Sequence, residues 1–168
     1  MNRDSTLRAW LDDHGAMIER IAYSYERRPA LVAELVQETA LALWRALPSF
    51  RGDSSEKTFI ARIAHNVSVS HVRKAARARW TPLSDALSDT LADEQPTPDE
   101  HADQRDRRAL LLNAVRDLPL SLRPVMTLHL EGFSNGEIAE ALSLTANNVG
   151  VRLTRGKTHL KKQLGNVT

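Results

Sequence analysis

The sequence contains no cysteine, so disulfide bonds and thiolate metal sites are excluded. It also has no apolar run close to the roughly 18 residues that a membrane span requires. Its first residues, MNRDSTLRAW, do not resemble a signal peptide. We therefore expect a cytoplasmic protein with no membrane contact of its own.

Charge of one sign is missing from three long stretches, although the net charge of the 168 residues is only +2. Residues 62–79 contain five Arg and Lys and no acidic residue. Residues 81–104 contain seven Asp and Glu and no Lys or Arg, and residues 145–168 again contain no acidic residue. This segregation is more informative than the net charge, because it predicts two basic modules separated by an acidic segment.

Apolar residues at helical spacing predict three helices in the first half, over residues 5–26, 30–47 and 56–79. The second helix presents Glu34, Gln37 and Glu38 on its polar face. A loop of composition PSFRGDSS separates it from the third helix, which Ser55 can cap. The third helix carries a polar and basic stripe, so it is a candidate nucleic-acid surface.

Residues 81–106 read as a flexible acidic linker, because they are polar, contain three prolines and lack the large apolar residues of a core. A short helix over Leu83–Leu91 is one option within it. Helical spacing returns over 105–118. Ser121 can cap a further helix, with Leu128 and Leu130 facing inward and Gly132 as its stop.

The last segment reads as two helices joined by a short turn. Ser134 and Glu137 have the spacing of a capping box, and Thr145 can cap the second helix. Such a pair of helices, with a basic second helix, has the layout of a DNA-reading helix-turn-helix, in which Asn can read adenine and Arg guanine. The apolar side of the second helix holds Val149, Leu153, Gly156, Leu160 and Leu164, and the opposite side holds Asn148, Arg152, Arg155 and His159.

These observations predict an all-α protein with two small helical domains, residues 1–80 and 107–168, joined by the acidic linker 81–106. The C-terminal domain is the one that ends in the helix-turn-helix.

Three stretches resemble the extracytoplasmic-function (ECF) group of bacterial RNA polymerase sigma factors. ELVQETALALWRAL resembles the polymerase-binding helix of the family, and FRGDSSEKTFIARIAHNVSVSHVRK resembles the loop and helix that open the minus-ten promoter element. Residues 118–164 resemble the domain that binds the minus-thirty-five element. The three stretches occur in the family's order around a linker of the expected kind.

The resemblance implies a role for each surface, with core RNA polymerase, promoter DNA and an anti-sigma factor as partners. Glu34, Gln37 and Glu38 would bind core polymerase. The minus-ten element would be bound by Arg51, Gly52, Asp53, Ser54, Arg62, Asn66, Arg73, Lys74 and Arg77. The minus-thirty-five element would be bound by Thr145, Asn147, Asn148, Arg152, Arg155 and Lys157.

The chain departs from the family pattern at four positions. Glu56 stands where an aromatic residue is usual, and Phe59 where Trp is usual. Gly150 stands where many members have a basic residue, and Gly156 where Ala is usual. Each glycine costs roughly 1 kcal/mol of helix propensity relative to Ala. Promoter preference therefore does not transfer from a relative.

Two other classes of protein are less consistent with the sequence. A plain transcriptional regulator would use the helix-turn-helix without polymerase, but it would leave the FRGDSS loop and the Glu34 face without a role. An enzyme would need a catalytic or metal-binding constellation, and the six His and 21 acidic residues have no suggestive spacing. We expect no enzymatic activity, no cofactor and no metal.

Overall fold

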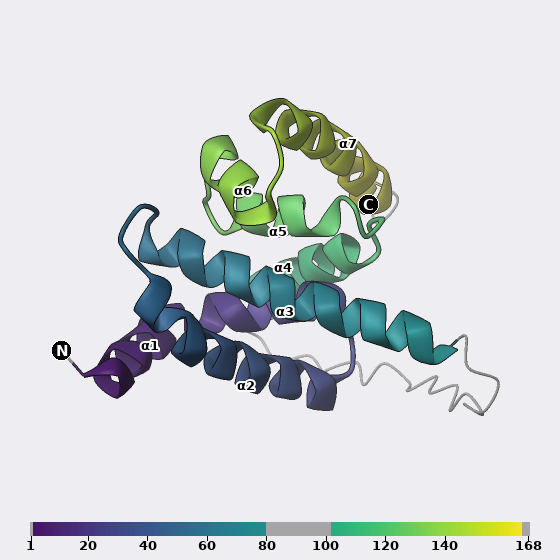
Figure 1. Cartoon of the computed structure of the whole chain (residues 1–168). Coiled ribbons are helices and arrows are strands. Elements are labelled where there is room, and N and C mark those ends of the chain that lie inside the picture. The colour runs from purple at the N-terminus through teal and green to yellow at the C-terminus, as the bar shows by residue number, and fades with distance from the viewer. Residues whose placement is uncertain (1, 80–101, 166–168) are drawn as a thin grey trace.

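The helices form two units that follow each other along the chain (Figure 1). The computed structural model describes residues 2–79 and 102–165, and no strand occurs among them. The N-terminal unit contains α1 (Arg3–Tyr25), α2 (Pro29–Ala46), the short 3-10 helix η1 (Leu47–Ser49) and α3 (Glu56–Arg79). The C-terminal unit contains α4 (Ala102–Arg116), α5 (Arg123–Leu130), α6 (Asn135–Leu142) and α7 (Ala146–Gly165). The all-α prediction is confirmed.

The N-terminal unit is a bundle in which α1, α2 and α3 all pack against one another. Three aromatic side chains join its parts. The Trp10 ring meets Phe50 edge-on, with ring centroids 5.3 Å apart, and Phe50 lies 4.9 Å from Phe59. Because Phe50 directly precedes the loop before α3, this cluster fixes where the loop begins.

The C-terminal unit packs α5, α6 and α7 together, with α4 against α5 and α7. Its local signals work as predicted. The Ser134 side chain accepts a hydrogen bond from the Glu137 backbone N–H, and the Glu137 carboxylate accepts one from the Ser134 N–H. Gly132 ends the preceding segment with a φ of +88°, a conformation that favours glycine.

The two units pack against each other along a surface that we call the interdomain seam, formed by α1 and α3 on one side and α4, α5 and α6 on the other. Buried residues from both units belong to one continuous core. Arg20 forms a bidentate ion pair with Glu131 across the seam, and Lys57 donates to the Glu131 carbonyl at 2.7 Å. The Lys57 ammonium also lies 4.6 Å from the centre of the Phe133 ring.

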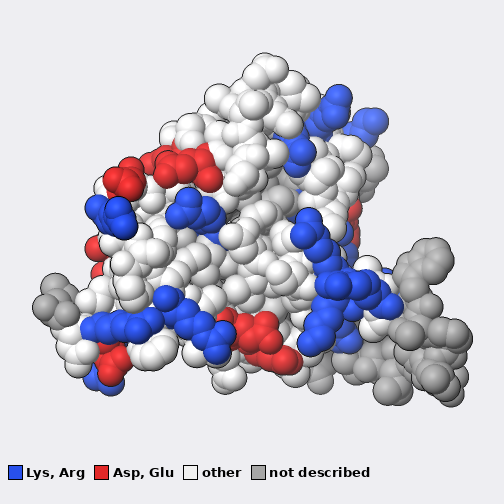
Figure 2. Space-filling model, in the orientation of Figure 1, with Lys and Arg blue, Asp and Glu red and all other residues white. Residues whose placement is uncertain are grey.

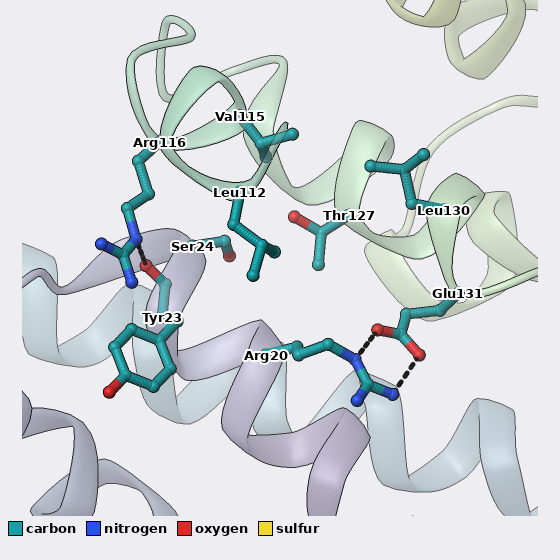
Figure 3. Close-up of a pocket in the computed structure, with 9 residues that line it drawn as sticks. All are labelled: Arg20, Tyr23, Ser24, Leu112, Val115, Arg116, Thr127, Leu130 and Glu131. Carbon is teal, nitrogen blue, oxygen red and sulfur yellow. Dashed lines mark hydrogen bonds and ion pairs between the residues drawn. The ribbon is translucent and has the colours of Figure 1, made fainter. Parts of the chain in front are cut away.

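A small hollow lies in this seam between α1, α4 and α5 (Figure 3). Arg116 closes one side, since its Nε donates to the Tyr23 carbonyl at 3.1 Å and its guanidinium lies over the Tyr23 ring. The Arg20–Glu131 pair closes the other side. Leu112, Val115 and Thr127 point into the space between them.

Three local predictions were wrong. Ser121 does not cap α5, which begins at Arg123 without a side-chain cap. Leu130 is 47% exposed instead of facing inward, because it lies at the edge of the hollow between α1, α4 and α5, and this position leaves nearly half of its surface open. Leu164 is 36% exposed, since it lies one turn beyond Leu160, the last buried residue of its stripe.

The predicted linker falls mostly outside the described residues, as does the suggested helix over Leu83–Leu91. Helix α4 begins at Ala102, inside that predicted linker. Residues 104–108 are polar and exposed, so they carry no apolar periodicity that could have announced the start of the helix.

Gly156 has a packing reason where the family usually has Ala. It is buried on the face of α7 that meets α5, and an added Cβ would lie 2.6 Å from both Cγ and Sδ of Met126. Gly150, in contrast, has no atom outside its own turns of helix within 4 Å of the position that a Cβ would take. Gly150 and Gly156 of α7 therefore differ in what surrounds them.

We predict opposite effects for alanine at these two glycines. Gly150→Ala should raise the free energy of unfolding by about 1 kcal/mol through helix propensity. Gly156→Ala should lower it by about 1 kcal/mol or more, because the overlap with Met126 exceeds the propensity gain. Urea denaturation followed by circular dichroism measures both. In a Met126→Val background the penalty of Gly156→Ala should shrink, and an unchanged penalty would contradict the steric explanation.

Candidate protein and nucleic-acid interfaces

The polar face of α2 carries the three residues predicted to bind polymerase. Glu34, Gln37 and Glu38 are all exposed, while Leu35 and Leu43 on the opposite face are buried. Sequence analysis missed Leu41, which is 48% exposed and lies one turn after Gln37. Its i+4 spacing was the available signal, because residues four apart share a helix face.

The C-terminal end of α2 is held against α1. Trp44 Nε1 donates to the Asp4 carboxylate at 3.0 Å, and the Arg3 guanidinium lies 3.8 Å from the centre of the Trp44 ring. Arg3 also donates to the Trp44 carbonyl oxygen. These contacts fix the C-terminal end of α2 against the start of α1.

The loop between η1 and α3 is anchored at both ends and exposed between them. Arg51, Gly52 and Asp53 are exposed, and Gly52 has a φ of +78°. At the far end, the Thr58 backbone N–H donates to Ser55 Oγ at 3.1 Å, which confirms the predicted cap of α3. The loop therefore presents backbone and short polar groups from a fixed position.

The basic stripe of α3 lies on a different side from the seam. Lys57 and His65, which approach the C-terminal unit, lie on one side of the helix. Lys and Arg gather over the C-terminal part of α3 in Figure 2. The exposed members of the stripe are Asn66, Arg73, Lys74 and Arg77, with Arg62 half-buried.

The ring of Phe59 is 5% exposed, in the aromatic cluster with Trp10 and Phe50. It therefore stabilises the base of the loop instead of offering an open stacking face. The Arg62 guanidinium lies 5.5 Å from the centre of this ring, which holds it near the loop. Glu56 is exposed in the first turn of α3.

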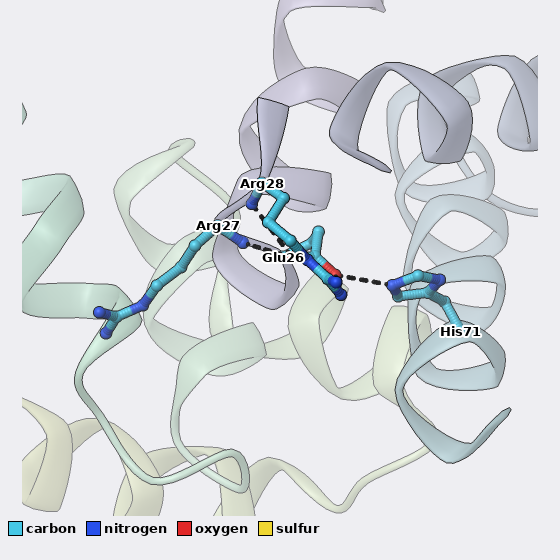
Figure 4. Close-up of polar contacts among 4 residues, drawn as sticks. All are labelled: Glu26, Arg27, Arg28 and His71. Atoms are coloured by element: carbon cyan, nitrogen blue, oxygen red, sulfur yellow. Dashed lines mark hydrogen bonds and ion pairs between the residues drawn. The ribbon is translucent and has the colours of Figure 1, made fainter. Parts of the chain in front are cut away.

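The turn between α1 and α2 is tied to α3 by a buried carboxylate (Figure 4). Glu26 accepts hydrogen bonds from Arg28 Nε at 3.0 Å and its backbone N–H at 3.1 Å. His71 Nε2 lies 2.9 Å from the other carboxylate oxygen. Burial alone would raise the pKa of Glu26, but the hydrogen bonds from Arg28 and His71 outweigh burial and lower the pKa to about 2.

A second histidine on α3 lies against the seam. The Tyr25 hydroxyl and His65 Nδ1 are 2.6 Å apart, and both residues border a small hollow with Pro124 and Leu142 of the C-terminal unit. Burial, with a contribution from the positive charge of Arg73, lowers the pKa of His65 to about 4. His65 is therefore neutral at pH 7, and α3 gains no charge at this point.

Helix α7 is capped as predicted, since the Asn148 N–H donates to Thr145 Oγ1 at 3.1 Å. Arg152 is half-buried. Its Nε donates to Asn148 Oδ1 and its Nη1 to the Ser121 carbonyl, both at 2.9 Å. Arg155 is exposed, as are Asn147 and Lys157. Sequence analysis missed Val151 and Thr154, which share the exposed side of α7 with Asn147 and Arg155.

The described residues contain no group of three or more His, Cys, Asp or Glu placed to hold a metal ion. In the same part of the chain, no helix has the length and apolarity needed to cross a membrane.

Comparison with known families assigns both units. Residues 10–78 match the family model of sigma-70 region 2, and residues 105–160 match that of sigma-70, region 4. Two helical units of these kinds, with α2, α3 and α7 exposed as described, define a sigma factor.

Curated relatives narrow the assignment. The chain is 31% identical over 135 residues to the ECF RNA polymerase sigma-E factor of Escherichia coli, covering 75% of this chain and 70% of the relative. It is 26% identical over 142 residues to the corresponding factor of Haemophilus influenzae, covering 79% and 74%. The chain belongs to the ECF family of RNA polymerase sigma factors, and its function is to direct transcription initiation.

Two solved structures share the fold. The sigma factor RpoE in complex with the anti-sigma factor NepR from Bartonella quintana has a TM-score of 0.76 at 22% identity, covering 98% of both chains. CnrH in complex with the cytosolic domain of CnrY has a TM-score of 0.69 at 22% identity, covering 98% of this chain and 91% of CnrH. In both matches, the similarity of fold covers the N-terminal and the C-terminal unit.

We predict that Glu26 contributes stability that is lost in acid. Its folded pKa of about 2 lies below the ordinary value of 4.5, so the stabilisation is complete above about pH 4.5 and disappears as the pH falls toward 2. Glu26→Gln should lower the free energy of unfolding at pH 7 by at most about 3 kcal/mol, a difference that narrows below pH 4. Urea denaturation across pH 2–7 measures it. Glu140→Gln, at an exposed position, is the control. A loss of unfolding free energy in Glu26→Gln that stays constant with pH would refute the prediction.

Proposed function

We propose that the three exposed helix faces divide the work of initiation, with α2 binding core RNA polymerase, α3 and its preceding loop opening the minus-ten element, and α7 binding the minus-thirty-five element. The observation that carries this proposal is the exposure of three chemically distinct faces. The α2 and α3 faces lie within the match to sigma-70 region 2, and the α7 face lies within the match to region 4. The residue roles below and the domain limits 1–80 and 107–168 belong to the proposal.

The α2 face suits a protein partner with basic helices. Glu34 and Glu38 supply negative charge, and Gln37 supplies a directional hydrogen bond. Leu41 adds apolar area at the same face, since it is 48% exposed. Charged, amide and apolar groups therefore lie side by side on this face, a combination that a protein partner can cover.

The α3 face suits a single strand of DNA. The loop at Gly52 and Asp53 exposes backbone and short polar groups, and Asn66 on α3 can bond the edge of an unstacked base. Arg73, Lys74 and Arg77 follow along the same side and would hold phosphates. Seam contacts on the other side of α3 leave this surface exposed.

The α7 face suits duplex DNA, because the N-terminal turns of a second helix enter the major groove in this motif. Asn147 and Arg155 are exposed there and can bond base edges or phosphates. Arg152 and Asn148 are bonded to each other, so they would have to change partners to reach a base. Thr145 and Lys157 would contact the backbone at either side.

We place this activity in the cytoplasm, as binding without catalysis, under the control of an anti-sigma factor. Support comes from the two structural neighbours, each solved as a complex with a second protein, one of them an anti-sigma factor. A mixture of this protein with core polymerase should comigrate on a sizing column and give promoter-dependent transcripts from a randomised promoter library. Failure of both would contradict the proposal.

For the α2 face, we predict that Gln37→Ala combined with Glu38→Ala weakens core polymerase binding by about three- to tenfold, the loss expected from two rim contacts. Both side chains lie opposite the buried face, so helicity should not change. Fluorescence titration of labelled protein with core polymerase measures the affinity. The pair Asp12→Ala and Asp13→Ala, exposed on α1, removes the same type of charge elsewhere and should leave the affinity unchanged.

For the α3 face, we predict that Asn66→Ala and Asp53→Ala bind duplex promoter with polymerase nearly normally but form few open complexes. Asn66 and Asp53 would contact a DNA base only after that base has left the stacked duplex. Arg155→Ala should instead weaken closed binding. Permanganate footprinting on duplex and premelted templates separates the two steps, and a bubble template should restore part of the melting defect. Equal defects in closed binding for all three variants would contradict separate roles.

A further inference from the structure

The exposed side of α7 is apolar at its centre. Val151 is 42% exposed, and it lies four residues after Asn147 and four before Arg155, so the three side chains follow one side of the helix. The buried stripe of Val149, Leu153 and Gly156 occupies the other side. Val151 therefore stands between the two polar groups that we assign to DNA.

Two neighbours extend this apolar surface. Thr154 is exposed, and its hydroxyl donates to the Gly150 carbonyl at 3.1 Å. Because the hydroxyl proton is already donated within the helix, Thr154 can offer a ligand only its methyl group and the acceptor lone pairs of its oxygen. Thr158 repeats the arrangement one turn later, with its hydroxyl donating to the Thr154 carbonyl at 3.0 Å.

A shallow hollow opens beside these side chains. Gly150 is one of the residues that line it, and no atom outside the neighbouring turns of α7 lies within 4 Å of the position that a Cβ would take there. An incoming group can therefore approach the helix backbone more closely at this turn than a larger residue would allow. The hollow is lined by Ala146, Asn147, Gly150, Val151, Thr154 and Arg155.

The major groove offers one apolar group to such a surface. Among the groove edges of the four bases, only thymine presents a methyl, and the remaining groups are hydrogen-bond donors and acceptors. An apolar side chain placed over a donor or acceptor removes it from water without replacing its bond, which is unfavourable. Val151 would thus favour thymine by contact and disfavour the other bases by desolvation.

We propose that Val151, with the Thr154 methyl and the hollow at Gly150, selects thymine in the minus-thirty-five element by contacting its C5 methyl group. This inference rests on the proposed role of α7. The proposed role of α7 assigns its charged and amide side chains to DNA. The inference adds one more residue, Val151, and the base that it recognises, thymine.

The test first selects upstream elements from a random library with the full chain and core polymerase. Each thymine of the selected duplex is then replaced by deoxyuridine, which removes the methyl group and keeps the base pair. Closed-complex affinity is measured by fluorescence anisotropy for the unaltered protein, for Val151→Ser and for Leu164→Ser. Leu164 serves as the control because it is also an exposed apolar residue of α7 but lies at the far end.

For the unaltered protein and Leu164→Ser, deoxyuridine at one thymine should weaken binding by about two- to fivefold, the loss expected for one buried methyl group. For Val151→Ser the same replacement should have no effect, with circular dichroism unchanged. A selected element without thymine, insensitivity to every deoxyuridine, or an effect that persists in Val151→Ser would overturn this inference alone. Failure to select any upstream element would overturn it together with the proposed role of α7.

Discussion

Each helix of this protein has one apolar stripe, and the need to bury that stripe determines what the opposite face can present. A fully buried Leu or Val side chain contributes about 1.5–3 kcal/mol, so Leu35 and Leu43 fix the rotation of α2 more firmly than any surface charge does. The binding faces follow from this constraint. Gln37 and Leu41 on α2, and Val151 on α7, are exposed because the buried stripes of their helices are fully packed elsewhere.

The parts of the structure that the sequence predicts are those determined within one or two turns of helix. The Ser134–Glu137 box, the Thr145 cap and the buried stripe from Val149 to Leu160 depend on near neighbours. Long-range contacts could not be predicted in this way. Arg152 is a residue type that often contacts DNA. In this structure it donates to the Ser121 carbonyl, and because the two residues are 31 positions apart, the sequence pattern could not predict this bond. Val151 was missed because an apolar residue carries no recognisable binding chemistry until its exposure is known.

Gly150 and Gly156 of α7 also separate what a family pattern can and cannot explain. Gly156 belongs to packing, because the Met126 side chain occupies the space that an alanine methyl would need. Gly150 belongs to the outer surface, where space is open. A resemblance identifies both as departures with the same propensity cost. Only the neighbours in three dimensions show that one departure concerns the core and the other the outer surface of α7.

The interdomain seam has a consequence for synthesis on the ribosome. Contacts among α1, α2 and α3 involve only residues 3–79, so this unit can fold while the rest of the chain is still being made. Arg20 and Glu131, however, are 111 positions apart. Until α4 and α5 emerge, the side of α1 that carries Arg20 and Tyr23 lacks the partners that cover it in the finished protein. The nascent N-terminal unit therefore passes through a stage in which a chaperone can reach a surface that the finished protein covers.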